Sequence, residues 1–71
     1  MPDSIYKVIE LVGTSTESWE KAAANAIEMA SKKLRDLRIA EVILMDAQIE
    51  GGKIHLYRTK MKLSFKYHLE D

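Results

Sequence analysis

The segment DLRIAEVILMD, residues 36–46, constrains the fold more than any other part of the chain. Its β-branched and apolar residues predict a strand, but they do not alternate with polar ones. In a regular strand, Val42 and Leu44 would point to one face. Ile43 and Met45 would then point to the other face. A strand with two apolar faces needs cover on both sides, and a chain of 71 residues has little material to provide it.

The small size of the chain sharpens this problem. With 46% apolar and 31% charged residues, the sequence is typical of a single globular domain over residues 1–71. In domains of this size a single hydrophobic core is marginal, and small chains therefore often rely on disulfides, metals or oligomerisation. The chain has no cysteine, and its two histidines, His55 and His68, cannot form a structural zinc site alone. Oligomerisation remains, and a metal held by carboxylates is compatible with the composition.

The first half of the chain predicts a strand followed by a helix. Residues 4–13 alternate and end at Gly13, which predicts a strand followed by a turn. Thr14 and Glu17 have the spacing of a capping box, and Ser15 is an equally good N-cap. Residues 17–37 predict a helix, because apolar residues recur at helical spacing: Trp19, Ala23, Ala26, Ile27, Ala30, Leu34 and Leu37.

The second half predicts a hairpin. A second strand is expected over residues 38–49, a glycine turn over 50–53, and a long third strand over 53–67. The third strand alternates cleanly, with one face formed by Tyr57, Thr59, Met61, Leu63, Phe65 and Tyr67. The order strand, helix, strand, strand predicts an α+β fold. One helix covers only one face of three strands, so we expect the second strand to be covered by further copies of the chain.

Charge and motifs exclude several classes of protein. The formal net charge is zero, which is unlike a general nucleic-acid binder. No apolar run is long enough to span a membrane, and the N-terminus lacks the features of a signal peptide, so we expect a cytoplasmic protein. No nucleophile elbow, phosphate loop or metal-hydrolase motif is present, so an enzyme is not expected.

Taken together in order, several segments resemble the dodecin family. They are VGTS at the end of the first strand, the Ala-rich helix running to LRDLR, the AEV segment, and KMKLSF in the last strand. The resemblance implies a three-stranded antiparallel sheet wrapped around one long helix. It also implies a hollow homododecamer that sequesters flavin, either riboflavin or FMN. A branch of the family with a similar helix start is associated with calcium, which is the alternative ligand.

The resemblance also implies where a flavin would bind. Flavin-binding members carry a stacking tryptophan at the position of Ile39, and a hydrogen-bonding glutamine at the position of Arg58. Isoleucine has no π face to stack on a flavin ring. Arginine only donates hydrogen bonds, so it could bind a flavin carbonyl or a phosphate but cannot reproduce the donor and acceptor of glutamine. Arg38, Met45 and Asp46 complete the predicted cofactor site.

Other residues have a structural and a functional interpretation. Trp19 either packs at the end of the core or at a subunit contact, or it stacks on a ligand. For a metal such as calcium, the candidate ligands are Glu17, Glu41 and Asp46. Glu17 alternatively caps the helix, and Glu41 alternatively forms an ion pair. The basic face of the third strand either is solvated or forms ion pairs with other chains, or it binds an anion such as a phosphate; it contains Arg58, Lys60, Lys62 and Lys66.

Overall fold

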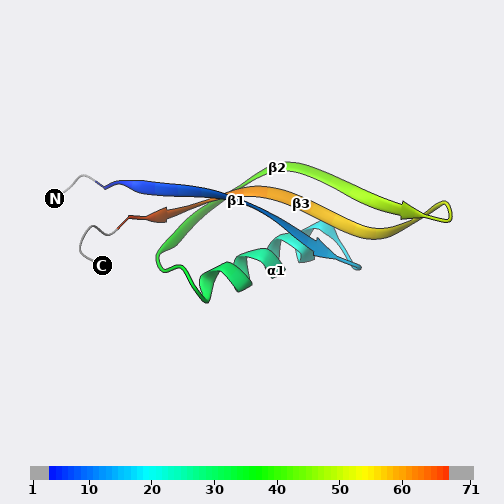
Figure 1. The fold of residues 1–71 in the computed structure, drawn as a ribbon, viewed down its shortest axis with the longest axis horizontal. Coiled ribbons are helices and arrows are strands. Elements are labelled where there is room, and N and C mark those ends of the chain that lie inside the picture. The colour runs from blue at the N-terminus through cyan, green and yellow to red at the C-terminus, as the bar shows by residue number, and fades with distance from the viewer. Residues whose placement is uncertain (1–3, 68–71) are drawn as a thin grey trace.

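The computed structural model describes residues 4–67 and shows a twisted three-stranded sheet with one helix beneath it (Figure 1). The elements are β1 (Tyr6–Ser15), α1 (Trp19–Ser31), β2 (Leu37–Glu50) and β3 (Lys53–Lys66). The strand order is β1-β3-β2, and both pairs are antiparallel. The predicted α+β class and element order are therefore confirmed. His68 lies outside the described residues.

The start of the helix differs from the prediction. β1 continues past Gly13 to Ser15, and Ser15 Oγ accepts a hydrogen bond from the main-chain N–H of Glu17 at 2.9 Å. The N-cap is Ser18, whose Oγ accepts from the Lys21 N–H at 2.9 Å. The predicted capping box is wrong because these residues finish the strand and form the turn.

The helix is also shorter than its apolar periodicity predicted. It ends at Ser31, and the N–H groups of Lys33 and Leu34 close a final turn on the Ala30 carbonyl. Asp36 then adopts a positive φ of 63°, which reverses the chain. Leu37 belongs to β2 and lies opposite Phe65, so its helical spacing is coincidental.

Gly13 sets how closely the helix approaches the sheet. A Cβ atom built on Gly13 would lie 2.0 Å from the carbonyl oxygen of Ala22 and 2.9 Å from the Ala26 Cβ. Ala22 is fully buried. The contact between β1 and α1 therefore requires a residue without a side chain on the strand.

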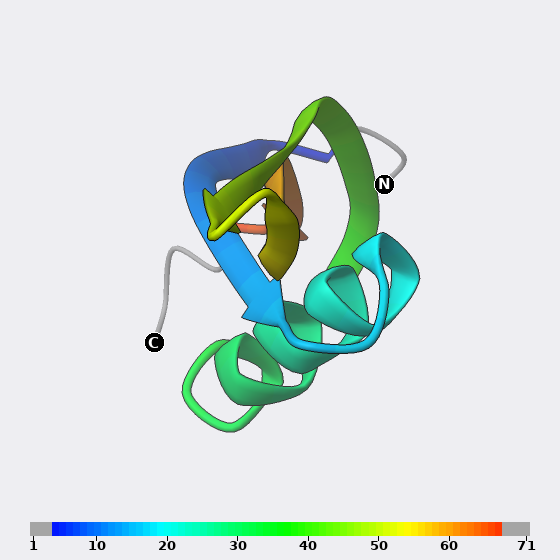
Figure 2. The same ribbon diagram turned by 90° about the vertical axis from the view of Figure 1, so that its right-hand side faces the viewer.

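The hydrophobic core of a single chain is thin. Among the described residues, only Ala22, Met61 and Leu63 form its fully buried apolar part. The radius of gyration is 14.7 Å, whereas a compact domain of this length would have a radius of gyration of about 11 Å. The end-on view in Figure 2 shows the sheet curling part of the way around the helix, which packs on β1 and β3 and barely touches β2. One chain alone leaves much apolar surface uncovered.

Candidate ligand-binding face of the sheet

A β-bulge explains why the apolar residues of β2 do not alternate. The register with β3 shifts between Val42 and Leu44, so Ile43 is an extra residue. Val42 lies opposite buried Met61, and Met45 lies opposite buried Thr59. Directly opposed residues of antiparallel strands share a face, so Val42 and Met45 both face the helix.

Leu44 and Asp46 point the opposite way, onto what we call the outer face, the side of the sheet away from α1. Leu44 lies opposite Lys60, and Asp46 lies opposite Arg58. The expectation that Val42 and Leu44 share a face is therefore wrong. The extra residue turns the later part of β2 over relative to a regular strand.

The best-defined polar feature of the outer face is an ion pair between neighbouring strands. Arg58 donates from Nε to Asp46 Oδ1 and from Nη2 to Asp46 Oδ2, both at 2.8 Å. This two-pronged geometry matches the planar guanidinium to the carboxylate. Both side chains are partly exposed, at 50% and 39%. The pair therefore lies where a ligand can reach it.

The pair makes the stability of the protein depend on pH. The hydrogen bonds from Arg58 hold the pKa of the Asp46 carboxyl below its ordinary value; desolvation opposes this and the charge of Arg58 adds to it. A group with a lowered folded-state pKa contributes stability above its unfolded-state pKa and loses it as the pH falls through the folded-state value.

We therefore expect Arg58→Met to lower the melting temperature at pH 7 but not in acid well below the ordinary aspartate pKa. Melting curves of both chains across this range measure the effect. Lys66→Met, which removes another charge from β3, is the control. The difference between its melting temperature and that of wild type should not shrink as the pH falls through the titration of Asp46. A constant difference between wild type and Arg58→Met at all pH values would contradict this assignment.

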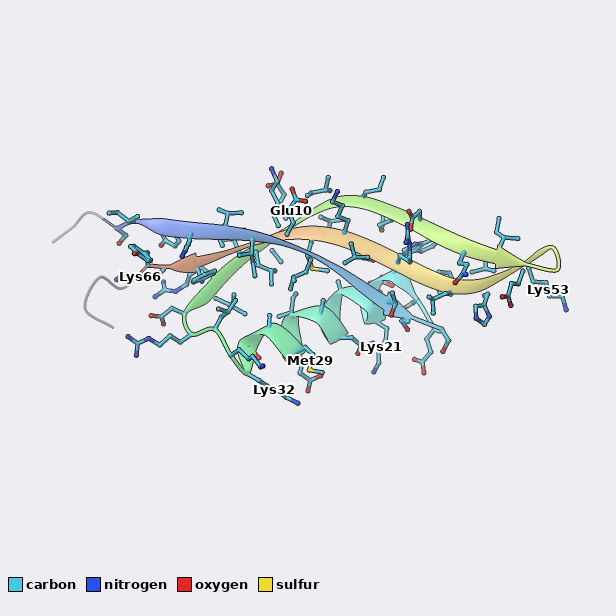
Figure 3. All side chains as sticks on the ribbon, in the orientation of Figure 1. Glu10, Lys21, Met29, Lys32, Lys53 and Lys66 are labelled. Carbon is cyan, nitrogen blue, oxygen red and sulfur yellow. The ribbon has the colours of Figure 1, made fainter. Side chains whose placement is uncertain are left out.

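Two of the other basic residues of β3, Lys60 and Lys62, lie close to or opposite carboxylates. Lys60 Nζ lies 3.6 Å from Glu10 Oε1, and Figure 3 shows Glu10 on the side of the sheet away from α1. Lys62 lies opposite both Glu10 and Glu41 in the register. The structure thus shows ion pairs within one chain for Arg58 and Lys60, whereas Lys66 lies opposite Tyr6.

On the inner face, Trp19 packs at the end of the core. Its ring meets the Tyr57 ring edge-on, with centroids 4.8 Å apart and planes at 75°. A cavity of about 290 Å³ beside it is lined in part by Met45 and Thr59. Trp19 Nε1 also donates to the main-chain carbonyl of Asp46 at 2.9 Å. This packing is the core-end position that the structural interpretation of Trp19 predicted, and its bond to Asp46 had no signal in the sequence.

Comparison with known proteins identifies the family. The family model described as Dodecin matches residues 5–68, which is nearly the whole chain. The chain belongs to the dodecin family. A dodecin structure from Streptomyces coelicolor superposes with a TM-score of 0.92 at 37% identity, covering 96% of this chain and 97% of the other.

Calcium is named for one of the related dodecins. The chain is 44% identical to the calcium dodecin of Mycobacterium tuberculosis over 89% of each sequence. The crystal structure of that calcium-chelating protein superposes with a TM-score of 0.83, covering 96% of this chain and 97% of the other. The dodecin of Thermus thermophilus is 36% identical over 87% of this chain and 90% of its own length.

The residues predicted for a dodecin flavin site do not come together within one chain. Ile39 lies opposite Ser64, whereas Asp46 lies opposite Arg58. Their partners Ser64 and Arg58 are six positions apart along β3, so Ile39 and Asp46 lie about 20 Å apart. Arg38 lies near Ile39, with its Nη2 at 3.9 Å from Asp36 Oδ1. Met45 faces the helix, on the other side of the sheet from Arg58. A single site containing Ile39 and Arg58 would need two copies of the chain.

The predicted metal ligands are also separate. Glu17 lies in the turn before α1, while Glu41 and Asp46 lie five positions apart on β2. Within residues 4–67, no three histidine, cysteine, aspartate or glutamate side chains are grouped closely enough to hold a metal ion. His55 Nδ1 lies 3.6 Å from Glu50 Oε1, far along the hairpin. A metal site would therefore have to form between chains.

The helix in the described part of the chain, α1, is not long and apolar enough to cross a membrane.

Proposed function

We propose that this chain forms a cytoplasmic homododecamer that binds and stores flavin, riboflavin or FMN, between outer faces of neighbouring copies. The observation that carries the proposal is the outer face itself. It exposes large apolar side chains on the same face as a partly exposed arginine–aspartate pair. Leu44, 52% exposed, lies two positions from Asp46, and Val8 and Ile39, 53% and 62% exposed, lie farther along the sheet opposite Ser64. Ligand pockets in proteins combine such apolar walls with a few oriented polar groups.

The arginine–aspartate pair supplies what arginine alone lacks. Arg58 donates hydrogen bonds from Nε and Nη2 to Asp46. Its Nη1 group makes no hydrogen bond within the described residues. Each Asp46 oxygen accepts one of these bonds, and a carboxylate has about four acceptor sites. The pair therefore presents a donor and an acceptor side by side. The edge of a flavin ring, with carbonyl oxygens and an N–H group, is complementary to that pattern.

Assembly would supply the missing walls. A flat ring needs an apolar surface on both faces, and one sheet offers only one. A second outer face apposed across a two-fold axis would cover the ring and the exposed leucine and isoleucine side chains together. Enclosed rings are shielded from solvent and light-driven chemistry, which is the basis of storage. This role needs no catalytic group.

The absence of a stacking aromatic residue at Ile39 gives a direct test. We expect Ile39→Trp to bind riboflavin about two- to tenfold more tightly, since stacking adds about 0.5–1.5 kcal/mol beyond area burial. Fluorescence titration with riboflavin and FMN measures the affinities. Ile39→Leu is the control and should bind as wild type does.

Weak binding would overturn the flavin proposal. The wild-type chain would be incompatible with storage if it bound both flavins with dissociation constants above about 100 µM. This corresponds to a binding free energy weaker than about −5.5 kcal/mol. An absorption spectrum of the freshly purified protein gives an independent reading. A yellow protein is expected, and a colourless one that also fails to bind added flavin contradicts the proposal.

Calcium binding is the second candidate, favoured by the 44% identity to a calcium dodecin. Calcium takes six to eight oxygen ligands, which one chain does not bring together among its described residues. Carboxylates such as Glu17 and Glu41 from several copies would have to converge. If calcium is the ligand, elemental analysis finds it in the purified assembly, and a chelator lowers the melting temperature without affecting any flavin affinity.

A further inference from the structure

One side-chain hydrogen bond ties the helix to each strand in the described part of the chain. Asn25 Nδ2 donates to the Thr14 carbonyl of β1 at 3.2 Å. Thr59 Oγ1 of β3 donates to the Trp19 carbonyl at 2.9 Å. Trp19 Nε1 donates to the Asp46 carbonyl of β2 at 2.9 Å. Trp19 therefore takes part in two of the three links, including the link to the strand that α1 barely touches.

The indole is well placed to act as a fixed point. The main-chain carbonyl of Trp19 accepts a hydrogen bond from Thr59, and the indole packs edge-on against the Tyr57 ring with centroids 4.8 Å apart. Both partners belong to β3, the central strand. The ring position is thus defined by the most constrained part of the sheet, and its N–H group reaches from there to the edge strand.

The part of β2 around Asp46, which accepts this hydrogen bond, is weakly constrained by the rest of the sheet. β2 is an edge strand, and its register with β3 shifts between Val42 and Leu44 and again between Gln48 and Ile49. Asp46 lies between these two irregularities. Bulges interrupt the ladder and change the local twist, so the hydrogen bonds of the sheet alone constrain Asp46 weakly. Its main chain is bound by Trp19 on one side, and its carboxylate pairs with Arg58 on the outer face.

We propose that Trp19 is a positioning residue for the Asp46–Arg58 pair, acting from the inner side of the sheet through the main chain of Asp46. The proposal deepens the proposed function, because it affects ligand binding only if this pair contacts the ligand. The positioning itself is measured without ligand. It also makes the only tryptophan of the chain a spectroscopic probe of the outer face.

The geometry of the pairing is given by the two hydrogen bonds at 2.8 Å, and in protein freed of metal ions with a chelator the titration of Asp46 measures it. The charged group facing its carboxylate is Arg58. The next outward-facing base of β3, Lys60, lies opposite Leu44 and is paired with Glu10 at 3.6 Å. From the helix, Glu20 lines the cavity beside Trp19 on the inner face. A change in the Asp46 titration therefore reports on its geometry with Arg58.

The test compares Trp19→Phe with Thr59→Val by following the Asp46 side-chain carboxyl carbon in an NMR pH titration. Phenylalanine keeps a ring against Tyr57 but has no N–H group for the Asp46 carbonyl. We expect the pKa of Asp46 to rise toward its ordinary value in Trp19→Phe. Thr59→Val removes the hydrogen bond to the Trp19 main-chain carbonyl but keeps the indole N–H group, so it should lower the melting temperature and shift the Asp46 titration less than Trp19→Phe does.

A measurement on the wild-type chain covers the case in which Trp19→Phe does not fold. The indole N–H gives a single resonance in a chain with one tryptophan. We expect this resonance to shift with pH at the midpoint of the Asp46 titration, because protonation of Asp46 releases Arg58 and alters the segment that the indole binds. An indole resonance that stays constant while Asp46 titrates overturns the proposal.

The outcomes separate this inference from the proposed function. If Asp46 titrates identically in wild type and Trp19→Phe, the positioning role is wrong, whether or not riboflavin binds. If riboflavin fails to bind the wild-type chain, the flavin proposal is wrong, and the Asp46 titrations still decide the role of Trp19. If both proposals hold, Trp19→Phe binds riboflavin less tightly than Thr59→Val does.

Discussion

Replacing Gly13 by alanine is expected to lower the free energy of unfolding by about 3 kcal/mol or more, because the added methyl group overpacks a closed contact. Its Cβ would lie 2.0 Å from the Ala22 carbonyl oxygen, a main-chain atom that cannot rotate away. The strand and the helix would have to separate, which opens the small core around Ala22. Denaturant unfolding at a fixed protein concentration measures the loss.

Gly51→Ala is the matched control for this substitution. Gly51 has a φ of 59°, and nothing lies within 4 Å of a Cβ atom built there. Alanine at this position meets only the backbone cost of a left-handed conformation, about 1–2 kcal/mol. Equal losses for the two variants would show that the contact between β1 and α1 tolerates a methyl group, contrary to the steric argument.

Leu44→Glu is expected to dissociate the assembly. Leu44 is 52% exposed on the outer face of β2, where the proposed two-fold contact would bury it. A carboxylate buried there without a partner costs about 3–5 kcal/mol, because Lys60 opposite already pairs with Glu10 at 3.6 Å. Light scattering over a range of concentrations should show a dodecamer for wild type and smaller species for the variant.

Val12→Glu provides a closely matched comparison. Val12 is also 52% exposed, also lies on the outer face and also lies opposite Lys60, but it belongs to β1. We expect its assembly to be affected much less, since the proposed contact is centred on β2. If both variants dissociate equally, the contact does not depend on β2. A wild-type chain that is monomeric in solution would refute the argument from uncovered apolar strands altogether.

Local patterns were sufficient for most of the fold. The alternation of β3 correctly predicted that Thr59, Met61 and Leu63 face the helix, where they are buried. The two glycines of the hairpin, Gly51 and Gly52, both have the positive φ that the tight turn requires. The predictions failed at the ends of α1, where several residues could serve as the N-cap. The choice of Ser18 follows from how far β1 runs along β3, which no local pattern specifies.

The candidate site was only partly predictable for a similar reason. Arg58 and Asp46 were both nominated from the sequence, but their bidentate pairing depends on the register of β2 against β3. That register includes the extra residue at Ile43. The bond from Trp19 to Asp46 joins residues 27 positions apart, so only the folded chain brings them together.

The sequence by itself determined the order of the elements and the excess of apolar surface on 36–46. These follow from spacing and composition, which act within a few residues along the chain. Tertiary structure alone decided which face each of those apolar residues occupies. The bulge at Ile43 turns Leu44 and Asp46 outward, because the extra residue reverses the alternation of side chains along β2. The segment therefore presents Val42 and Met45 to its own helix and Leu44 and Asp46 to the outer face, where a ligand or another copy would bind.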